Sequence, residues 1–115
     1  MNSRAVCKMM NDRLSDDGGE VEVLHTVEPL YYPSDSTLVT CLTEAYQEVT
    51  GDTETQPMVI GGGTYAKGID NTIAFGCAFP GNDYHIHDAN EWVRVDELLK
   101  QAEIYVAGIC KLLKI

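Results

Sequence analysis

The stretch Val95–Leu113, VDELLKQAEIYVAGICKLL, decides the fold because its apolar residues recur at the i, i+3, i+4 spacing of an amphipathic helix. The apolar stripe on one side of this predicted helix consists of Val95, Leu98, Leu99, Ala102, Tyr105, Val106, Ile109, Leu112 and Leu113. Its burial contributes on the order of 10–20 kcal/mol before conformational entropy is subtracted, at about 1.5–3 kcal/mol for each large side chain. The helix is therefore expected to pack on an apolar surface.

Two apolar runs upstream are predicted to form that surface. Residues 57–60 read as a short buried strand, and residues 72–79, TIAFGCAF, read as a strand that is covered on both faces. A further helix is expected through Thr50, with Ser34 or Asp35 as its N-terminal cap. Strands that alternate with helices in this way predict an α/β layered core.

The N-terminal part is predicted to be a helix, a turn and a strand. Residues 4–14 carry apolar side chains near helical spacing, and residues 16–19, DDGG, end that pattern. Residues 20–26 alternate as a strand does, and His25 within them is interpreted as structural. The proline-bounded residues 29–33 are predicted to be an extended linker and a domain boundary.

The composition excludes several classes of protein. Hydrophobic residues make up 44% and charged residues 23% of the chain, as in an ordinary globular domain. The net charge of -10, from 18 acidic and 8 basic residues, argues against a nucleic-acid partner, which would require a basic face. No apolar run is long enough to span a membrane and no signal peptide follows Met1, so a cytoplasmic location is expected.

The cysteines are spaced too widely for a zinc knuckle or a redox pair. Cys7, Cys41, Cys77 and Cys110 include no C-x-x-C motif. They are interpreted as buried free thiols in a reducing compartment, rather than as disulfides.

The glycine-rich stretch VIGGGTYAKG, residues 59–68, is a candidate binding loop. Its three glycines let the backbone approach a ligand, while Thr64 offers a hydroxyl and Lys67 a cation, so the loop would suit an anionic group. It matches neither the dinucleotide fingerprint nor the P-loop. The alternative is a tight turn that uses glycine for positive φ.

The stretch YHIHDANEW, residues 84–92, is a candidate metal-binding loop. His85 and His87 could provide two ligands from an extended segment, with Asp83 or Asp88 as a third. A hydrolytic zinc site normally has about three protein ligands and one open position. The alternative is a polar loop whose histidines are surface or hydrogen-bonded residues.

The order of these motifs resembles the C-terminal end of the zinc exopeptidases related to carboxypeptidase G, aminoacylase and succinyl-diaminopimelate desuccinylase. The resemblance rests on GGGTYA at 61–66, the strand-like TIAFGCAFPG at 72–81, H-x-x-N-E at 87–91 and the long terminal helix. It covers roughly residues 20–115 and is greatest to the bacterial Xaa-His, or carnosine-type, dipeptidases. The fold it implies is a partial layered α/β catalytic domain with a mixed sheet.

The resemblance assigns the metal-binding role to one histidine. His87 heads the H-x-x-N-E motif and so falls at the family's last metal ligand, with Asn90 and Glu91 as supporting groups, whereas His85 does not head the motif.

The resemblance assigns the glycine-rich loop to the substrate cleft. Gly62, Gly63 and Thr64 fall on the loop that lines this cleft in such enzymes. Lys67 stands where related dipeptidases often carry arginine, so a bidentate contact to a carboxylate would become a point-charge contact.

The resemblance also implies what this chain lacks. The family's other ligands to its two zinc ions and its general-base glutamate belong to an N-terminal portion, so no catalytic residue is expected here and one imidazole would not retain zinc. Residues 1–28 are expected to be the end of a ferredoxin-like α+β lid domain, and residues 29–115 the C-terminal portion of the catalytic domain. The expected partners are a short peptide substrate, the missing N-terminal portion and a second copy in a homo-oligomer.

Two rival interpretations remain open from the sequence. One is a non-catalytic assembly module, whose exposed sheet edge and apolar helix pair with a missing half or with a second copy. The other is a small independent protein whose glycine-rich loop binds an anion without a metal.

Overall fold

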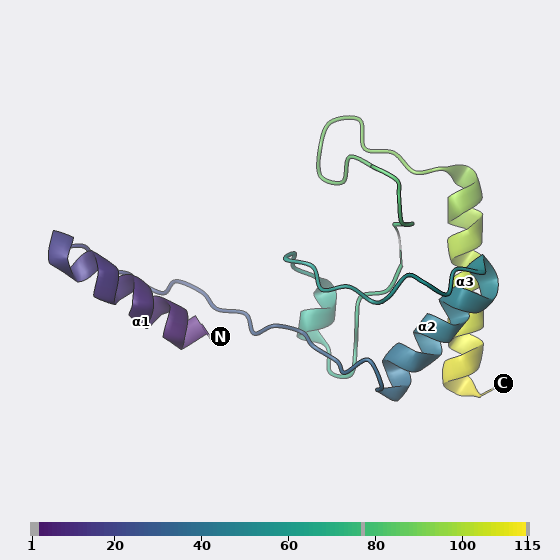
Figure 1. The fold of residues 1–115 in the computed structure, drawn as a ribbon, viewed down its shortest axis with the longest axis horizontal. Helices are drawn as coiled ribbons and strands as arrows, with labels where there is room; N and C mark the ends of the chain where they lie inside the picture. Colours follow the sequence, from purple (N-terminus) through teal and green to yellow (C-terminus); the bar gives the residue numbers. More distant parts are fainter. Residues whose placement is uncertain (1–2, 77, 115) are drawn as a thin grey trace. The chain divides into compact units, whose positions relative to one another are not determined.

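A computed structural model describes residues 3–76 and 78–114 of the chain. Its elements, shown in Figure 1, are the helices α1 (Ser3–Leu14), α2 (Thr37–Thr50) and α3 (Val95–Leu113) and the 3-10 helices η1 (Ser15–Asp17) and η2 (Tyr65–Gly68). The chain forms two compact units. The first unit comprises the chain up to Tyr31 together with Gly63–Thr72, and the second comprises Tyr32–Gly62 together with the chain from Ile73 onward.

The first unit begins with α1 and the turn that ends it. Gly18 adopts the left-handed conformation, with φ of 72°, directly after η1, as the glycines at 18 and 19 predict. The Asn11 side chain accepts a hydrogen bond of 2.8 Å from the backbone N–H of Val21. The helix and turn predicted for residues 4–19 are therefore confirmed.

The helix α2 has caps at both ends. The Ser36 side chain accepts a hydrogen bond from the N–H of Val39, so the N-terminal cap lies one residue beyond the predicted Asp35. Gly51 takes the left-handed conformation, with φ of 73°, and its N–H donates to the carbonyl of Gln47. The prediction of this helix is confirmed.

The residues after α2 fold back on it through Asp52. The Asp52 carboxylate accepts hydrogen bonds from the backbone N–H groups of Thr55 and Glu54 and from the Tyr46 hydroxyl. These bonds, those from Thr55 foremost, hold the pKa of Asp52 far below its usual value. The turn is thus closed by an ionised side chain.

The core of the second unit is the packing of α3 on α2. Figure 1 shows the two helices side by side, and their facing surfaces bury Val39, Ala45, Gln101, Ile104 and Gly108. The absence of a side chain at Gly108 lets the helices approach closely, because a Cβ there would lie 3.1 Å from Cδ2 of Leu42.

An ion pair flanks this packing. Nζ of Lys111 on α3 lies 2.9 Å from Oε2 of Glu48 and 3.8 Å from Oε2 of Glu44, and these two glutamates belong to α2. The hydrogen bond to Glu48 raises the pKa of Lys111 above its ordinary value.

The bounds predicted for α3 are confirmed, but its predicted buried face is wrong. The face that contacts α2 carries Gln101, Ile104 and Gly108, whereas the predicted stripe from Val95 to Leu113 is largely exposed. The physical reason is that the described residues do not form the sheet that was predicted to cover the stripe, while the absence of a side chain at Gly108 lets the other face of α3 approach α2.

The strands predicted at 20–26, 57–60 and 72–79 are not present in the part of the chain that the structure describes, and Cys77 lies outside that part. The layered α/β core with a mixed sheet is accordingly not formed by these residues. Their side chains are mostly exposed, with Val59 at 89%. A strand exists only through hydrogen bonds to a neighbouring strand, and no such ladder joins the described residues of these segments.

The cysteines at 7, 41 and 110 are free, as predicted, but half-buried rather than buried. None of the helices between residues 3 and 114 combines the length and the apolar character that a membrane crossing needs.

Candidate functional site: the loop at 79–92

Tyr84 anchors the loop that carries the two predicted metal-binding histidines. Its buried hydroxyl accepts hydrogen bonds from the backbone N–H of Phe79, at 3.1 Å, and from Nδ2 of Asn82, at 3.0 Å. The centroid of its ring lies 5.1 Å from that of the Trp92 ring, and the backbone N–H of Trp92 donates a hydrogen bond to the backbone carbonyl of Tyr84. The loop is therefore closed at its base by one aromatic pair and three hydrogen bonds.

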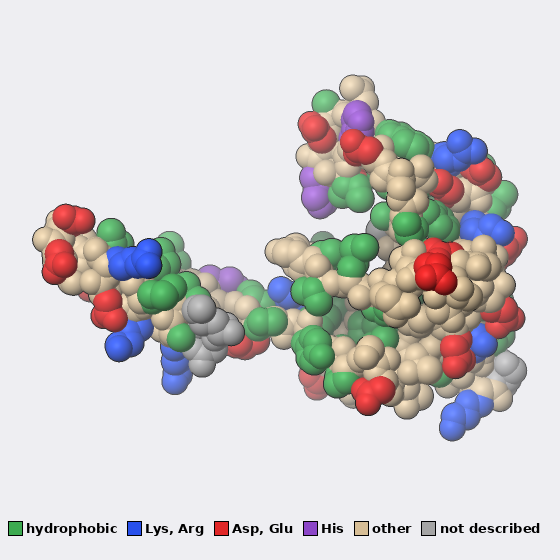
Figure 2. Space-filling model, viewed as in Figure 1, with side chains coloured by type: hydrophobic (Ala, Val, Ile, Leu, Met, Phe, Trp, Pro, Cys, Tyr) green, Lys and Arg blue, Asp and Glu red, His purple; other side chains and the backbone are tan. Residues whose placement is uncertain are grey.

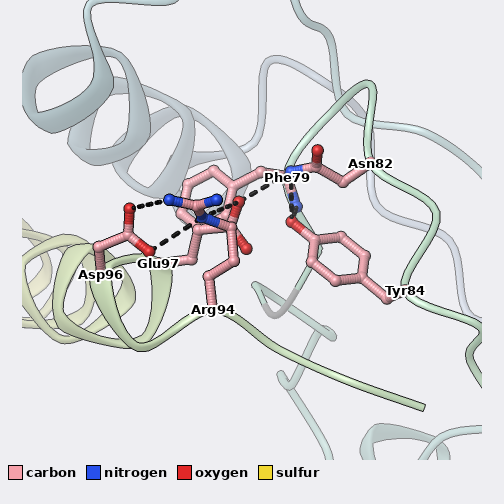
Figure 3. A network of polar contacts seen from close by, with 6 residues as sticks. All are labelled: Phe79, Asn82, Tyr84, Arg94, Asp96 and Glu97. Carbon is pink, nitrogen blue, oxygen red and sulfur yellow. Dashed lines mark hydrogen bonds and ion pairs between the residues drawn. The ribbon is translucent and has the colours of Figure 1, made fainter. Parts of the chain in front are cut away.

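The loop is joined to the first turn of α3, as Figure 3 shows. Nδ2 of Asn82 donates a 2.8 Å hydrogen bond to Oε1 of Glu97, and Arg94 binds Asp96 through two hydrogen bonds of 3.0 and 2.8 Å. The Asp96 carboxylate raises the pKa of the Arg94 guanidinium, which in turn lowers the pKa of Asp96. A rigid helix thus holds the start of the loop.

Glu97 keeps one oxygen without a partner. Its Oε2 is buried and has no hydrogen-bond partner among the residues that the structure describes. The Oε1 of the same carboxylate, by contrast, accepts from Asn82. The carboxylate therefore retains one free acceptor position beside the loop.

The two histidines differ in how they are held. The backbone N–H of His85 donates to Oδ1 of Asp83 at 3.0 Å, and its Nδ1 lies 3.3 Å from the carbonyl oxygen of Ala89. His87 is exposed, and its side chain forms no hydrogen bond or ion pair with the residues that the structure describes. Figure 2 shows histidine side chains at the surface of this loop. His85 thus serves the loop itself, whereas the imidazole of His87 faces solvent.

Left-handed backbone is concentrated here. His85, His87 and Asn90 have φ values of 53°, 66° and 60°, which residues other than glycine rarely adopt. Each such residue costs on the order of 1–3 kcal/mol, and such strain clusters at binding and catalytic sites. Asn90, a predicted supporting group, therefore shares the backbone conformation of His87, while Glu91 next to it is exposed.

The residues in this loop do not form a metal centre by themselves. No cluster of three or more histidine, cysteine, aspartate or glutamate side chains that could hold a metal occurs in residues 3–76 and 78–114. Within the loop, Oδ2 of the Asp83 carboxylate lies 3.9 Å from Nε2 of His85. The alternative of a local site built from His85, His87 and nearby aspartates is therefore not supported, and the chain's residues do not fit a zinc ion on their own.

The glycine-rich loop is open and irregular. Gly62 and Gly63 are exposed, and neither has a positive φ, so the alternative of a turn that needs glycine for its backbone is wrong. Thr64 caps η2, because its Oγ1 accepts from the N–H of Ala66 at 3.3 Å. A shallow hollow of about 460 Å³ is lined by Gly63, Thr64 and Tyr65. Lys67 is exposed within η2.

The predicted site is divided between the two compact units, and the division falls within the glycine-rich loop. Gly63, Thr64 and Lys67 lie in the first unit, whereas Gly62 and His87 lie in the second. The assignment of these residues to one cleft stays a prediction.

Asn82, Tyr84 and Glu97 position the loop, but their sequence context does not identify them in that role. A tyrosine next to a histidine and an asparagine after Pro80-Gly81 are weak signals, because the hydroxyl's partners become visible only when the loop closes. The acidic residue in the first turn of the terminal helix has an ordinary explanation in the helix dipole.

Replacing Tyr84 by phenylalanine is expected to loosen this loop. The change keeps the ring against Trp92 but removes the acceptor of two hydrogen bonds, so we expect the second unit to lose about 1–3 kcal/mol of stability. Trp92, the chain's single tryptophan, reports on the loop through its fluorescence during urea unfolding. Tyr65→Phe is the matched control, because Tyr65 is 97% exposed, and equal effects in both variants would contradict this account.

Comparisons with known proteins identify relatives of one kind. The model of peptidase family M20/M25/M40 matches residues 6–111. A "Putative dipeptidase SSP1012" of Staphylococcus saprophyticus is 35% identical over 95 residues, which are 83% of this chain and 20% of that protein. A "Putative dipeptidase" of Staphylococcus epidermidis is 33% identical over 96 residues, 84% of this chain and 20% of the relative. The chain thus spans about a fifth of the length of the curated relatives it matches, and no solved structure matches it significantly.

Proposed function

Because the chain belongs to peptidase family M20/M25/M40, we propose that it is the C-terminal part of a zinc-dependent dipeptidase, which supplies one metal ligand and part of the substrate cleft. The observation that carries the proposal is the state of His87. Its imidazole is exposed on a strained loop that Tyr84 and α3 hold in place, yet residues 3–76 and 78–114 gather no cluster of metal ligands around it. This is the arrangement expected of a ligand that completes its metal site with groups outside the described residues.

The supporting residues follow from the same proposal. Asn90 and Glu91 would orient the loop around His87, and Gly62, Gly63 and Thr64 would line the cleft with exposed backbone. Lys67 would attract the carboxylate of a short peptide. The names of the staphylococcal relatives support a dipeptide as the substrate class, whereas a preference for Xaa-His peptides rests on the sequence resemblance alone.

The partner in this proposal is the N-terminal portion of the catalytic domain. The relatives are about five times as long as the segment they share with this chain, so they have the length to carry the remaining ligands and the general base. Exposed apolar residues at 57–60 offer a surface for such a portion, since extended backbone with free donors and acceptors can join a sheet. Residues 1–28 would then end the lid domain, and a cytoplasmic location remains a prediction.

A zinc titration of the purified chain tests whether its own ligands suffice. We expect calorimetry to detect no tight stoichiometric site in the wild type or in His87→Ala, and we expect no dipeptide turnover with added zinc, because a catalytic zinc needs about three protein ligands. His25→Ala serves as the matched control, since His25 is also exposed. Tight binding that disappears only in His87→Ala, together with turnover, would show that the chain is a complete enzyme.

A further inference from the structure

Two buried polar atoms of α3 have no hydrogen-bond partner among the residues that the structure describes. One is Oε2 of Glu97, which is an acceptor, and the other is Nε2 of Gln101, which is a donor. The Glu97 side chain is 16% exposed and Gln101 is 7% exposed, and solvent does not reach either atom. An unpaired buried polar group raises the unfolding equilibrium constant by about tenfold or more, so most such groups in folded proteins are paired.

The positions of these two atoms suit them to each other. Gln101 follows Glu97 by four residues, and side chains at this spacing are neighbours on the same side of a helix. An amide donor and a carboxylate acceptor are complementary, so one hydrogen bond satisfies both. A group from another molecule, by contrast, would first have to displace the residues that cover the two atoms.

Glu97 connects this pair of atoms to the loop at 79–92. Its Oε1 accepts a 2.8 Å hydrogen bond from Nδ2 of Asn82, which also donates to the Tyr84 hydroxyl at 3.0 Å (Figure 3). The last torsion of a glutamate side chain is soft, so a carboxylate held at one oxygen rotates easily. A second hydrogen bond, at Oε2, would fix the plane of the carboxylate and keep Oε1 directed at Asn82.

We propose that Nε2 of Gln101 donates a hydrogen bond to Oε2 of Glu97, and that Gln101 is thereby a positioning residue for the loop at 79–92. The support of the loop then reaches back from Asn82 and Glu97 to Gln101, which is buried in the packing of α3 on α2. The pairing does not depend on the proposed function, whereas its consequence for His87 as a metal ligand rests on that function.

The substitution Gln101→Met tests the pairing by the direction of its effect on stability. Methionine has a similar length but no donor, so Oε2 of Glu97 would be left buried and unpaired. We expect the unfolding equilibrium constant of the full chain to rise by about tenfold, measured by urea unfolding with Trp92 fluorescence. A constant that stays the same or falls would overturn the proposal, because an amide without a partner is improved by an apolar replacement.

The same substitution in a Glu97→Met background completes a double-mutant cycle. Oε2 is absent there, so we expect Gln101→Met to leave the unfolding equilibrium constant unchanged or to lower it. An equal rise in both backgrounds would contradict the pairing. The matched control is Gln47→Met, which makes the same replacement at a half-buried glutamine of α2 and should change the constant by less than about twofold.

Hydrogen exchange distinguishes positioning of the loop from a general effect on stability. The backbone N–H of Trp92 closes the base of the loop by donating to Tyr84, and we expect Gln101→Met to accelerate its exchange by about tenfold. The N–H of Thr55, which donates to Asp52 in the same unit, should change by less than about twofold. Equal acceleration at both amides would overturn the positioning role.

A measurement on the unmodified chain remains decisive if a variant does not fold. We expect nuclear Overhauser contacts between the Nε2 protons of Gln101 and the side-chain protons of Glu97, and their absence would contradict the pairing. None of these measurements involves zinc or peptide hydrolysis. Failure of the pairing is therefore distinguishable from failure of the proposed function.

Discussion

A staphylococcal relative in which this chain replaces the matching segment is expected to hydrolyse dipeptides, and to lose that activity when His87 is changed to alanine. The relatives share 33–35% identity with the chain over 83–84% of its length, so the exchange keeps the family's motifs in register. Removal of a metal ligand is expected to lower kcat/KM by more than the 10–100-fold that is typical for loss of a group that orients a ligand. The measurement is dipeptide hydrolysis together with the zinc content of the purified chimera.

Two controls make this experiment specific. His25→Ala, at the exposed histidine outside the loop, should leave both hydrolysis and zinc content unchanged. Asn90→Ala should fall between the two, with a loss of roughly 10–100-fold, because it would act through His87. A chimera that keeps its zinc and its activity after His87→Ala would remove the basis of the proposed function.

The substitution Ile104→Ala is expected to cost the second unit about 2–4 kcal/mol of unfolding free energy. Ile104 is 4% exposed at the centre of the α2–α3 packing, so its truncation removes apolar burial and leaves a cavity between the helices. The unit has few other buried side chains to compensate, among them Val39, Ala45 and Tyr84. Urea unfolding followed by Trp92 fluorescence gives the difference, since Trp92 belongs to the same unit.

The control for this variant is Ile109→Ala. Ile109 lies on the same helix with the same change in side-chain volume and helix propensity, but it is 56% exposed. We expect its effect to stay within about 0.5 kcal/mol. Equal losses at both positions would mean that α3 does not pack on α2 through the face that carries Ile104.

Local patterns predicted the helices well. The bounds Val95–Leu113 follow from apolar periodicity, and the end of α2 follows from Gly51, because helix hydrogen bonds and caps join residues that are close in sequence. The N-terminal cap of α2 is Ser36 rather than the predicted Ser34 or Asp35, because serine and aspartate are both good caps and the pattern does not choose among the three.

The strands could not be predicted in this way. Residues 57–60 have the apolar character of a buried strand, yet Val59 is 89% exposed, since a strand depends on partners that sequence periodicity does not supply. The candidate site shows the same division. The H-x-x-N-E motif identified His87, whereas the support of the loop by Tyr84 and Glu97 became visible only from hydrogen bonds across 5 to 15 residues.

The sequence by itself determined the three helices, the turn after α1 and the family-like order of the glycine-rich and histidine motifs, because each depends on residues near one another in the chain. The tertiary structure decided which face of α3 is buried. Apolar character favoured the stripe from Val95 to Leu113, but the close approach of Gly108 to Leu42 and Ala45 placed the face with Ile104 and Gly108 against α2. Packing depends on the shapes of two surfaces together, and the periodicity of one helix describes only its own side of that contact.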